Sequence, residues 1–399
     1  MQSASQIPTA TQAAAKRFAT WLALVYATGF GIVGTHQPFF PVWLKAVGVD
    51  PAWIGVIMAI PSVTRFTTLP FVTSFAERHQ ALRGGIIAMG FATTAGLAIV
   101  GLQHLAVLIF LAYALTCCIW TPMVPLIDAY ALRGIRQFGL KYGPLRLWGS
   151  AAFVAGALAC GALIDVIAAR HLIWIITATA ALSALVSLGL KPLAPLKPAP
   201  AAHQGTSALL RDRGFLAIIL ASALIQSSHS AYYVVASIAW RQEGFGGLTI
   251  AALWTLGVLA EIVVFALSPR FTLPSAMLVI VAAACAITRW VITAQAPPIA
   301  ILAVVQTLHG LTFGLTQVGI MGLIVHRVPS HVMARGQGYL AACGGMVTGS
   351  AYVLSGAVFA RYGQNVYYVM AVIAACGGLV MWSARHLLMD HPHSAVSGG

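Results

Sequence analysis

Hydrophobic residues lie in long blocks along this chain, and short polar segments separate the blocks. A helix that crosses a membrane needs about 20 mostly apolar residues. One apolar run of that length can be the core helix of a soluble protein, whereas a long series of them is typical of a membrane protein. The pattern predicts an all-α membrane protein with twelve transmembrane helices. Their centres lie near Tyr26, Pro61, Ala92, Thr116, Ala157, Ile176, Leu224, Val258, Ala282, Leu311, Met346 and Ala374.

The longest polar segment, residues 191–214, reads KPLAPLKPAPAAHQGTSALLRDRG and divides the predicted helices into two sets of six. Its prolines favour an extended chain, so we expect a cytoplasmic linker. A Gly-Ser dipeptide occurs in the fifth predicted helix of each half, at 149–150 and 349–350. Two pseudo-symmetric bundles are a recurrent plan among transporters. The expected parts are a cytoplasmic tail (1–15), an N-terminal six-helix bundle (16–190), the linker (191–214), a C-terminal six-helix bundle (215–388) and a cytoplasmic tail (389–399).

The composition agrees with a membrane protein, because 60% of the residues are hydrophobic and only 8% are charged. The net charge of +14 reports orientation rather than a nucleic-acid partner. With the N-terminus placed in the cytoplasm, sixteen of the 22 Lys and Arg residues fall inside, four fall outside, and Arg65 and Arg289 lie within predicted helices. This is the positive-inside bias of membrane proteins. Both termini are therefore predicted to be cytoplasmic.

Four ionisable residues lie deep inside apolar stretches: Arg65, Asp128, Glu261 and Arg289. A charge at the centre of a bilayer costs roughly 2.5–3.5 kcal/mol on insertion scales. A membrane protein keeps such a charge where it faces a partner or a wet cavity. Buried charges in both halves therefore indicate a transport pathway.

The sequence shows no pattern that is typical of a metal site or of an enzyme active site. The six cysteines fall in apolar segments without the spacing of metal ligands. We find no set of nucleophile, base and acid, and no phosphate-binding loop. We therefore expect no metal, no cofactor and no enzymatic activity.

The segment SFAERHQALRGG (74–85) resembles a degenerate form of the loop motif of the major facilitator superfamily. Glu77, Arg78 and Arg83 keep the motif's acid–Arg pair and its following basic residue, whereas Ser74 replaces the usual glycine. The resemblance implies that these three residues gate the cytoplasmic side. The alternative is a loop that is merely basic.

Longer motifs, in order over nearly the whole chain, resemble the 3-phenylpropionic acid transporter family. They include PFFPVWLKAVGV (38–49), TPMVPLIDAYALR (121–133), YGPLRLWGSAAF (142–153), HSAYYVVASIAW (229–240), LWTLGVLAEIVVFALSPRF (253–271), TRWVI (288–292) and LHGLTFG (308–314). The chain is more distantly similar to lactose permease and related oligosaccharide and nucleoside proton symporters. These resemblances imply the major facilitator fold, a bacterial inner-membrane location and a monomer.

Asp128 and Arg146 lie on consecutive predicted helices, which must run antiparallel. A charge pair between them would neutralise both residues at membrane depth. The resemblance to lactose permease implies that both contact substrate, with Phe153 as an aromatic platform. The alternative is a pair that only holds the two helices together.

Arg65 favours an organic anion as substrate, because a guanidinium binds a carboxylate in a bidentate fork. The alternative is that its side chain snorkels to the membrane surface. His229 and Tyr233 share one helix face at a spacing of four residues. Aromatic walls suit a phenyl ring. The alternative here is an ordinary packing face.

Glu261 is the leading candidate for the proton site, because a carboxyl group in a low-dielectric environment readily binds a proton near neutral pH. Arg289 and His309 match the coupling residues of lactose permease. This chain departs from lactose permease at two nearby positions. Thr312 stands where that protein has an acid, and Gln306 stands where it has a lysine. The proton carrier is therefore Glu261, His309 or Asp128, or coupling is absent.

These inferences predict a proton-coupled secondary transporter that takes up a small aromatic carboxylate such as 3-phenylpropionate. The two halves would rock around a central substrate site. The predicted partners are an organic anion, protons and the lipid bilayer. One alternative is a sugar or nucleoside proton symporter. The other, of a different class, is a membrane sensor with a transporter fold that does not transport.

Overall fold

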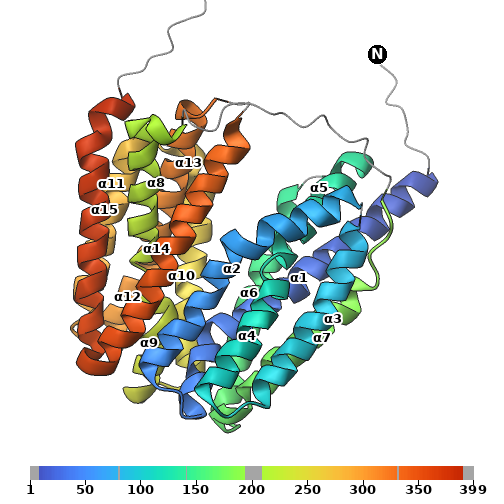
Figure 1. Ribbon diagram of the computed structural model, residues 1–399, viewed down its shortest axis with the longest axis horizontal. Helices are drawn as coiled ribbons and strands as arrows, with labels where there is room; N and C mark the ends of the chain where they lie inside the picture. The colour runs from blue at the N-terminus through green and yellow to red at the C-terminus, as the bar shows by residue number, and fades with distance from the viewer. Residues whose placement is uncertain (1–8, 80, 141, 194–208, 330–331, 390–399) are drawn as a thin grey trace, which may run out of the picture. The chain divides into compact units, whose positions relative to one another are not determined.

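The computed structural model describes residues 9–79, 81–140, 142–193, 209–329 and 332–389, in which helices joined by turns and short loops are the regular structure (Figure 1). The helices before the polar segment are α1 (Thr9–Ala46), α2 (Pro51–Arg78), α3 (Leu82–Gly101), α4 (Ala106–Trp120), α5 (Met123–Phe138), α6 (Tyr142–Ile164) and α7 (Leu172–Ser187). Those after it are α8 (Arg213–Ser227), α9 (Ser230–Gln242), α10 (Gly247–Leu267), α11 (Ser275–Thr293), α12 (Ile299–His309), α13 (Leu315–Arg327), α14 (Met333–Tyr362) and α15 (Val366–Met389).

Eleven segments of the described chain are long and apolar enough to cross a membrane. The longest, Arg335–Leu388, contains both α14 and α15, which a short 3₁₀ turn at Gly363–Asn365 separates. Three other segments each combine two helices: α4 with α5, α8 with α9, and α12 with α13. Each of the twelve predicted centres falls in one of the eleven segments. The predicted all-α membrane fold is confirmed.

Local sequence explains one of the helix interruptions. Pro122 lies between α4 and α5, where its missing N–H removes one helical hydrogen bond. Between α12 and α13 the chain forms a five-residue π-helix, η4, at Gly310–Gly314. Such π-helical turns are rare and occur frequently at functional sites. Thr312 lies at the centre of this one.

The chain divides into two compact units. Unit 1 comprises residues 1–49, 67–199 and 246–251, and unit 2 comprises residues 50–66, 200–245 and 252–399. The first part of α2 therefore belongs to unit 2 and the rest to unit 1. The predicted boundaries at 16–190 and 215–388 stay predictions. Most of the predicted linker and of both tails lies outside the described residues.

Close backbone contacts position the helices within unit 1. Helix α1 packs against α6 and α7. Gly34 on α1 lies directly against the backbone of Phe153 on α6, and Gly156 lies against the backbone of Gly31. Small residues allow such close approach in membrane helix pairs. Residues of α1, α5 and α6 are thereby brought together.

In unit 2, α8 packs against α13, α14 and α15, and α11 packs against α13 and α15. Buried apolar residues including Phe215, Ile225, Val279 and Met381 form the core of these helices. Gly310 in η4 lies against the backbone of Ala260 on α10. This contact places the π-helix beside Glu261, the next residue of α10.

Candidate functional site

The polar cluster of unit 1 is centred on Asp128 of α5. Its Oδ1 atom accepts hydrogen bonds from the hydroxyls of Tyr26 on α1, at 2.6 Å, and Tyr142 on α6, at 3.0 Å. Tyr26 is fully buried. Hydrogen bonds to an ionised acceptor are stronger than neutral ones. Two neutral donors therefore hold the carboxylate, and they tie three helices together.

Arg146 contacts aromatic rings rather than the Asp128 carboxylate. Its guanidinium carbon lies 3.8 Å from the centre of the Phe30 ring and 5.6 Å from that of Tyr26. Between the described side chains of Asp128 and Arg146 the structure shows no ion pair. The expected direct charge pair is corrected: Tyr26 lies between the two groups and contacts both. Cation–π contacts of this kind contribute about 0.5–2 kcal/mol.

The aromatic ring next to Arg146 belongs to Phe30 and not to Phe153. Phe153 contributes its backbone to the contact with Gly34. Sequence reasoning missed Tyr26, Phe30 and Tyr142, because aromatic residues are common in membrane helices. The predicted roles of Asp128, Arg146 and Phe153 in substrate binding stay predictions.

The polar cluster of unit 2 is centred on Arg289 of α11, which is fully buried. Its Nη2 donates to Oε1 of Gln306 at 2.9 Å. Its Nη1 contacts Nδ1 of His309 at 2.9 Å and donates to Oγ1 of Thr312 at 3.3 Å. The guanidinium also lies over the rings of Tyr232, at 4.9 Å, and Trp290, at 4.4 Å. Neutral groups thus hold this buried cation.

The contact with Arg289 determines which nitrogen of His309 carries the proton. A guanidinium only donates hydrogen bonds, so Nδ1 of a neutral His309 must accept and Nε2 must hold the hydrogen. Nε2 lies 3.8 Å from Oε2 of Glu261 on α10. The His309 side chain is 7% exposed and that of Glu261 is 25% exposed. The imidazole therefore directs an N–H group from a buried position towards a more accessible carboxyl group.

Thr312 connects Arg289 to a second histidine. Its Oγ1 lies 2.9 Å from Nε2 of His229, while Nδ1 of His229 lies 3.2 Å from the carbonyl oxygen of Gln226. With Nδ1 donating to that carbonyl, Nε2 accepts from the Thr312 hydroxyl, which itself accepts from Arg289. Thr312 lies within the π-helix. Thr312 thus has a polar linking role.

The structure brings together four predicted residues, Glu261, Arg289, His309 and His229. Tyr233 belongs to the same group, since its ring packs against His229 at 6.4 Å and it interacts electrostatically with Glu261. Sequence reasoning missed Trp254 and Trp290, which complete the aromatic surroundings. Trp254 lies 5.9 Å from Tyr233, and Trp290 lies 5.1 Å from His229.

Arg65 lies on the part of α2 that belongs to unit 2, and its side chain is exposed. It makes no hydrogen bond or ion pair to the residues that the structure describes. Its charge interacts electrostatically with Tyr352 of α14. Among the described side chains, no carboxylate pairs with this cation on a membrane-spanning helix.

The predicted gating loop is described only in part. Nε of Arg83 donates to the carbonyl oxygen of Leu190 at 2.6 Å, which connects the start of α3 to the segment after α7. The side chains of Glu77 and Arg78 lie outside the described residues. Gating by these three residues stays a prediction.

A buried histidine in unit 1 was also missed. Nε2 of His36 lies 3.0 Å from the hydroxyl of Tyr113, and its ring packs on Phe40 at 4.5 Å and Trp120 at 4.7 Å. A single histidine in an apolar helix gives no sequence signal that separates such a packed position from a functional one.

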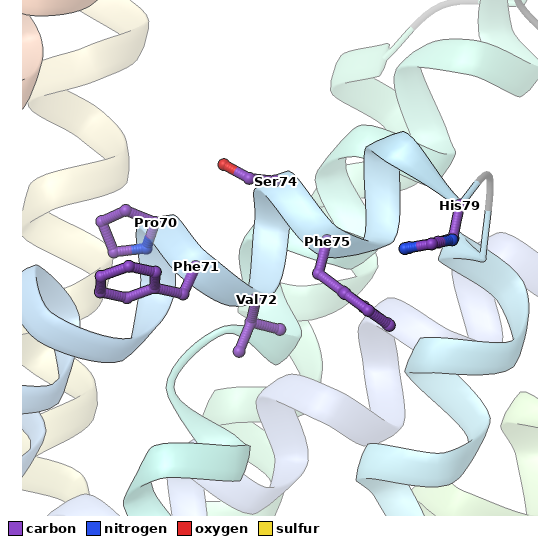
Figure 2. Close-up of a pocket in the computed structure, with 6 residues that line it drawn as sticks. All are labelled: Pro70, Phe71, Val72, Ser74, Phe75 and His79. Atoms are coloured by element: carbon purple, nitrogen blue, oxygen red, sulfur yellow. The ribbon is translucent and has the colours of Figure 1, made fainter.

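A pocket of about 740 Å³ lies along the C-terminal part of α2 and contains none of the predicted substrate-binding residues (Figure 2). It is lined by Pro70, Phe71, Val72, Ser74, Phe75 and His79. Figure 2 shows the Ser74 side chain directed away from those of Phe75 and His79. Phe71 and Phe75 are exposed, as rings that face lipid would be.

Comparison with known proteins identifies the family. The model of the MFS_1 like family matches residues 19–370. The probable 3-phenylpropionic acid transporter of Escherichia coli (strain K12) is 33% identical over 89% of this chain and 94% of its own length. The maltose permease of Geobacillus stearothermophilus is 26% identical over 73% of this chain and 75% of its own length.

The fold matches a solved transporter. The crystal structure of the nucleoside transporter NupG superposes with a TM-score of 0.77 at 15% identity, over 94% of this chain and all of that one. These relatives are transporters and not enzymes, as expected from the sequence. The chain therefore belongs to the MFS_1-like family and is a multi-pass membrane transporter of the major facilitator type.

Proposed function

We propose that this protein is a secondary active transporter that takes up a small aromatic carboxylate, such as 3-phenylpropionate, by alternating access. The proposal rests on Arg65, whose guanidinium makes no hydrogen bond or ion pair to a described residue. An unpaired guanidinium on a membrane-spanning helix is costly unless a ligand or water completes it. A carboxylate matches the paired N–H groups of a guanidinium, which a sugar hydroxyl does not need.

The surroundings of His229 and Tyr233 suit the apolar part of such a substrate. Tyr232 and Trp254 pack against each other with ring centres 4.3 Å apart, and Tyr233 lies 5.9 Å from Trp254. Aromatic side chains offer large apolar faces to a phenyl ring. The relative at 33% identity is named for 3-phenylpropionic acid, which supports the same substrate class.

Glu261, His309 and Arg289 are proposed as the proton-coupling group. The buried Arg289 fixes the orientation of His309, whose N–H faces the Glu261 carboxyl group. In this proposal Glu261 is protonated before the anion binds. The proton and the anion then cross together, so the transport step moves no net charge from this pair.

A sugar or nucleoside proton symporter is the second candidate. The Asp128 cluster favours it, because a carboxylate held by two tyrosine hydroxyls offers the hydrogen-bonding groups that polyhydroxyl ligands use. The similarity to a maltose permease, at 26% identity, also supports a sugar symporter. A sugar or nucleoside substrate gives the Arg65 guanidinium no carboxylate to bind.

Competition in proteoliposomes separates the two candidates. Uptake of labelled 3-phenylpropionate is measured with an excess of unlabelled 3-phenylpropionate, 3-phenylpropanamide, maltose or uridine. We expect only the unlabelled acid to compete strongly, because the amide lacks the charge that Arg65 binds. Arg65→Gln should abolish the uptake, while Arg361→Gln, at an exposed arginine of α14, should leave it unchanged. Uptake of labelled maltose or uridine, with none of the acid, would overturn the proposal.

A further inference from the structure

Within unit 2, the first part of α2 and helix α14 are in direct backbone contact. A Cβ added at Gly55 would lie 2.5 Å from the carbonyl oxygen of Tyr352 and 3.0 Å from the backbone of Gly356. Only glycine allows this approach. The contact fixes the position of Tyr352 relative to α2.

The same two helices stay in contact further along their length. A Cβ added at Gly349 would lie 3.6 Å from the Ser62 side chain, and one at Gly345 would lie 3.1 Å from the Ser62 carbonyl oxygen and 3.0 Å from the Phe66 ring. Residues later in α2 thus contact residues earlier in α14. The two segments run antiparallel.

This arrangement directs Arg65 and Tyr352 towards each other. Side chains of an α-helix lean towards its N-terminus by about one turn. Arg65 therefore leans back to the level of Ser62, and Tyr352 leans back to the level of Gly349, which contacts Ser62. The electrostatic interaction between Arg65 and Tyr352 agrees with this convergence.

Both groups have unused hydrogen-bonding capacity. A guanidinium has five N–H donors, and Arg65 donates none of them within the part of the chain that the structure describes. The hydroxyl of Tyr352 makes no hydrogen bond to a described residue either, and its side chain is only partly buried. Two adjacent, unoccupied donors of this kind match a ligand that only accepts hydrogen bonds.

We propose that Arg65 and Tyr352 form one carboxylate subsite, in which the guanidinium and the tyrosine hydroxyl donate to the same substrate carboxylate. This inference rests on the proposed function, and Tyr352 is its new element. An ionised carboxylate has about four acceptor positions, so it can take a bidentate arginine and a third donor. A tyrosine adds this donor without a second positive charge. Net charge at the subsite is therefore zero when the anion is bound.

Tyr233 relates the proposed subsite to the proposed proton site. Tyr233 interacts electrostatically with Tyr352 and with Glu261, so a single aromatic residue connects the two. Its ring also lies 6.4 Å from His229. A phenyl group that extends from the bound carboxylate along Tyr233 would thus meet the aromatic residues of α9.

Tyr352→Phe tests the subsite, because it removes one hydroxyl and keeps the aromatic ring. The matched control is Tyr362→Phe, which changes an exposed tyrosine of the same helix. Initial rates of 3-phenylpropionate uptake into proteoliposomes give KM and Vmax for the wild type, for both variants, and for Arg65→Lys with and without Tyr352→Phe. Thermal unfolding in detergent checks that each variant is folded.

We expect Tyr352→Phe to raise KM about tenfold with Vmax nearly unchanged, which is the usual effect of losing a hydrogen bond to a charged group. The control should keep the wild-type KM. In the double variant the two effects should be less than additive, because both residues bind the same carboxylate. An unchanged KM in folded Tyr352→Phe, beside normal wild-type uptake, would overturn the subsite and leave the proposed function standing. No wild-type uptake would overturn both.

Discussion

Arg289 and His309 are joined by a 2.9 Å contact that orients the imidazole towards Glu261. Among the described residues no carboxylate hydrogen-bonds to this buried arginine, and uncharged acceptors on α12 and η4 hold it. Its Nε–H is buried without a hydrogen-bond partner among the described residues, so the remaining acceptors matter and removing one of them should be measurable.

Gln306→Leu should destabilise the protein, because Nη2 of Arg289 would lose its acceptor inside the bundle. An unsatisfied buried polar group costs about 1–3 kcal/mol, and more when it is charged. The midpoint of thermal unfolding in detergent should fall accordingly. Gln295→Leu is the control, since Gln295 is exposed just after the end of α11 and its side chain donates to the carbonyl oxygen of Val291. Equal midpoints for the two variants would contradict this account of Arg289.

Thr312→Val should slow transport, whereas Thr312→Ser should retain most of it. Valine keeps the shape but removes the hydroxyl that links Arg289 to His229. Serine keeps that hydroxyl. The initial uptake rate of each variant is the measurement. If valine and serine gave the same rate, the link through Thr312 would have no part in transport.

These polar partners show what the sequence could and could not indicate. Arg289, Glu261 and Asp128 are visible in the sequence because a charge is rare in an apolar block. Tyr26 is not, because aromatic residues are common in membrane helices.

The fold itself follows from the length and number of the apolar blocks, which is why all twelve predicted centres fall in membrane-length segments. The π-helix at Gly310–Gly314 and the position of Tyr26 between Asp128 and Arg146 depend on how the helices pack. A single sequence does not contain that information in readable form.

Gly34→Ala should separate α1 from α6, because its Cβ would collide with the backbone of Phe153. Forcing extra atoms into a packed contact costs about 1–3 kcal/mol. Gly31→Ala on the same helix is the control, since a Cβ there meets nothing within 4 Å. Thermal unfolding should show a lower midpoint for Gly34→Ala and no loss for Gly31→Ala. The reverse order would contradict the close packing of these helices.

Asp212 should make stability depend on pH. The Arg327 guanidinium binds both oxygens of its carboxylate, each at 2.7 Å, and holds the Asp212 pKa below the ordinary value of 3.8. A depressed folded-state pKa contributes stability above the unfolded value and loses it as the pH falls through the folded value.

The wild type should therefore be more stable than Asp212→Asn at pH 6, and the difference should shrink below about pH 3.8. Unfolding midpoints of both proteins from pH 6 to pH 3 provide the measurement. Arg327→Gln should remove the same difference, because it removes the same partner. A difference that stayed constant over this range would show that the pair does not set the pKa.

We propose that this protein couples the uptake of an aromatic acid to protons. The direct measurement is uptake of labelled 3-phenylpropionate into proteoliposomes, with an inward proton gradient and with that gradient collapsed. We predict accumulation above the external concentration only while the gradient is present, and loss of that accumulation in Glu261→Gln. Uptake that is indifferent to the gradient, or no greater than in empty liposomes, would contradict the account.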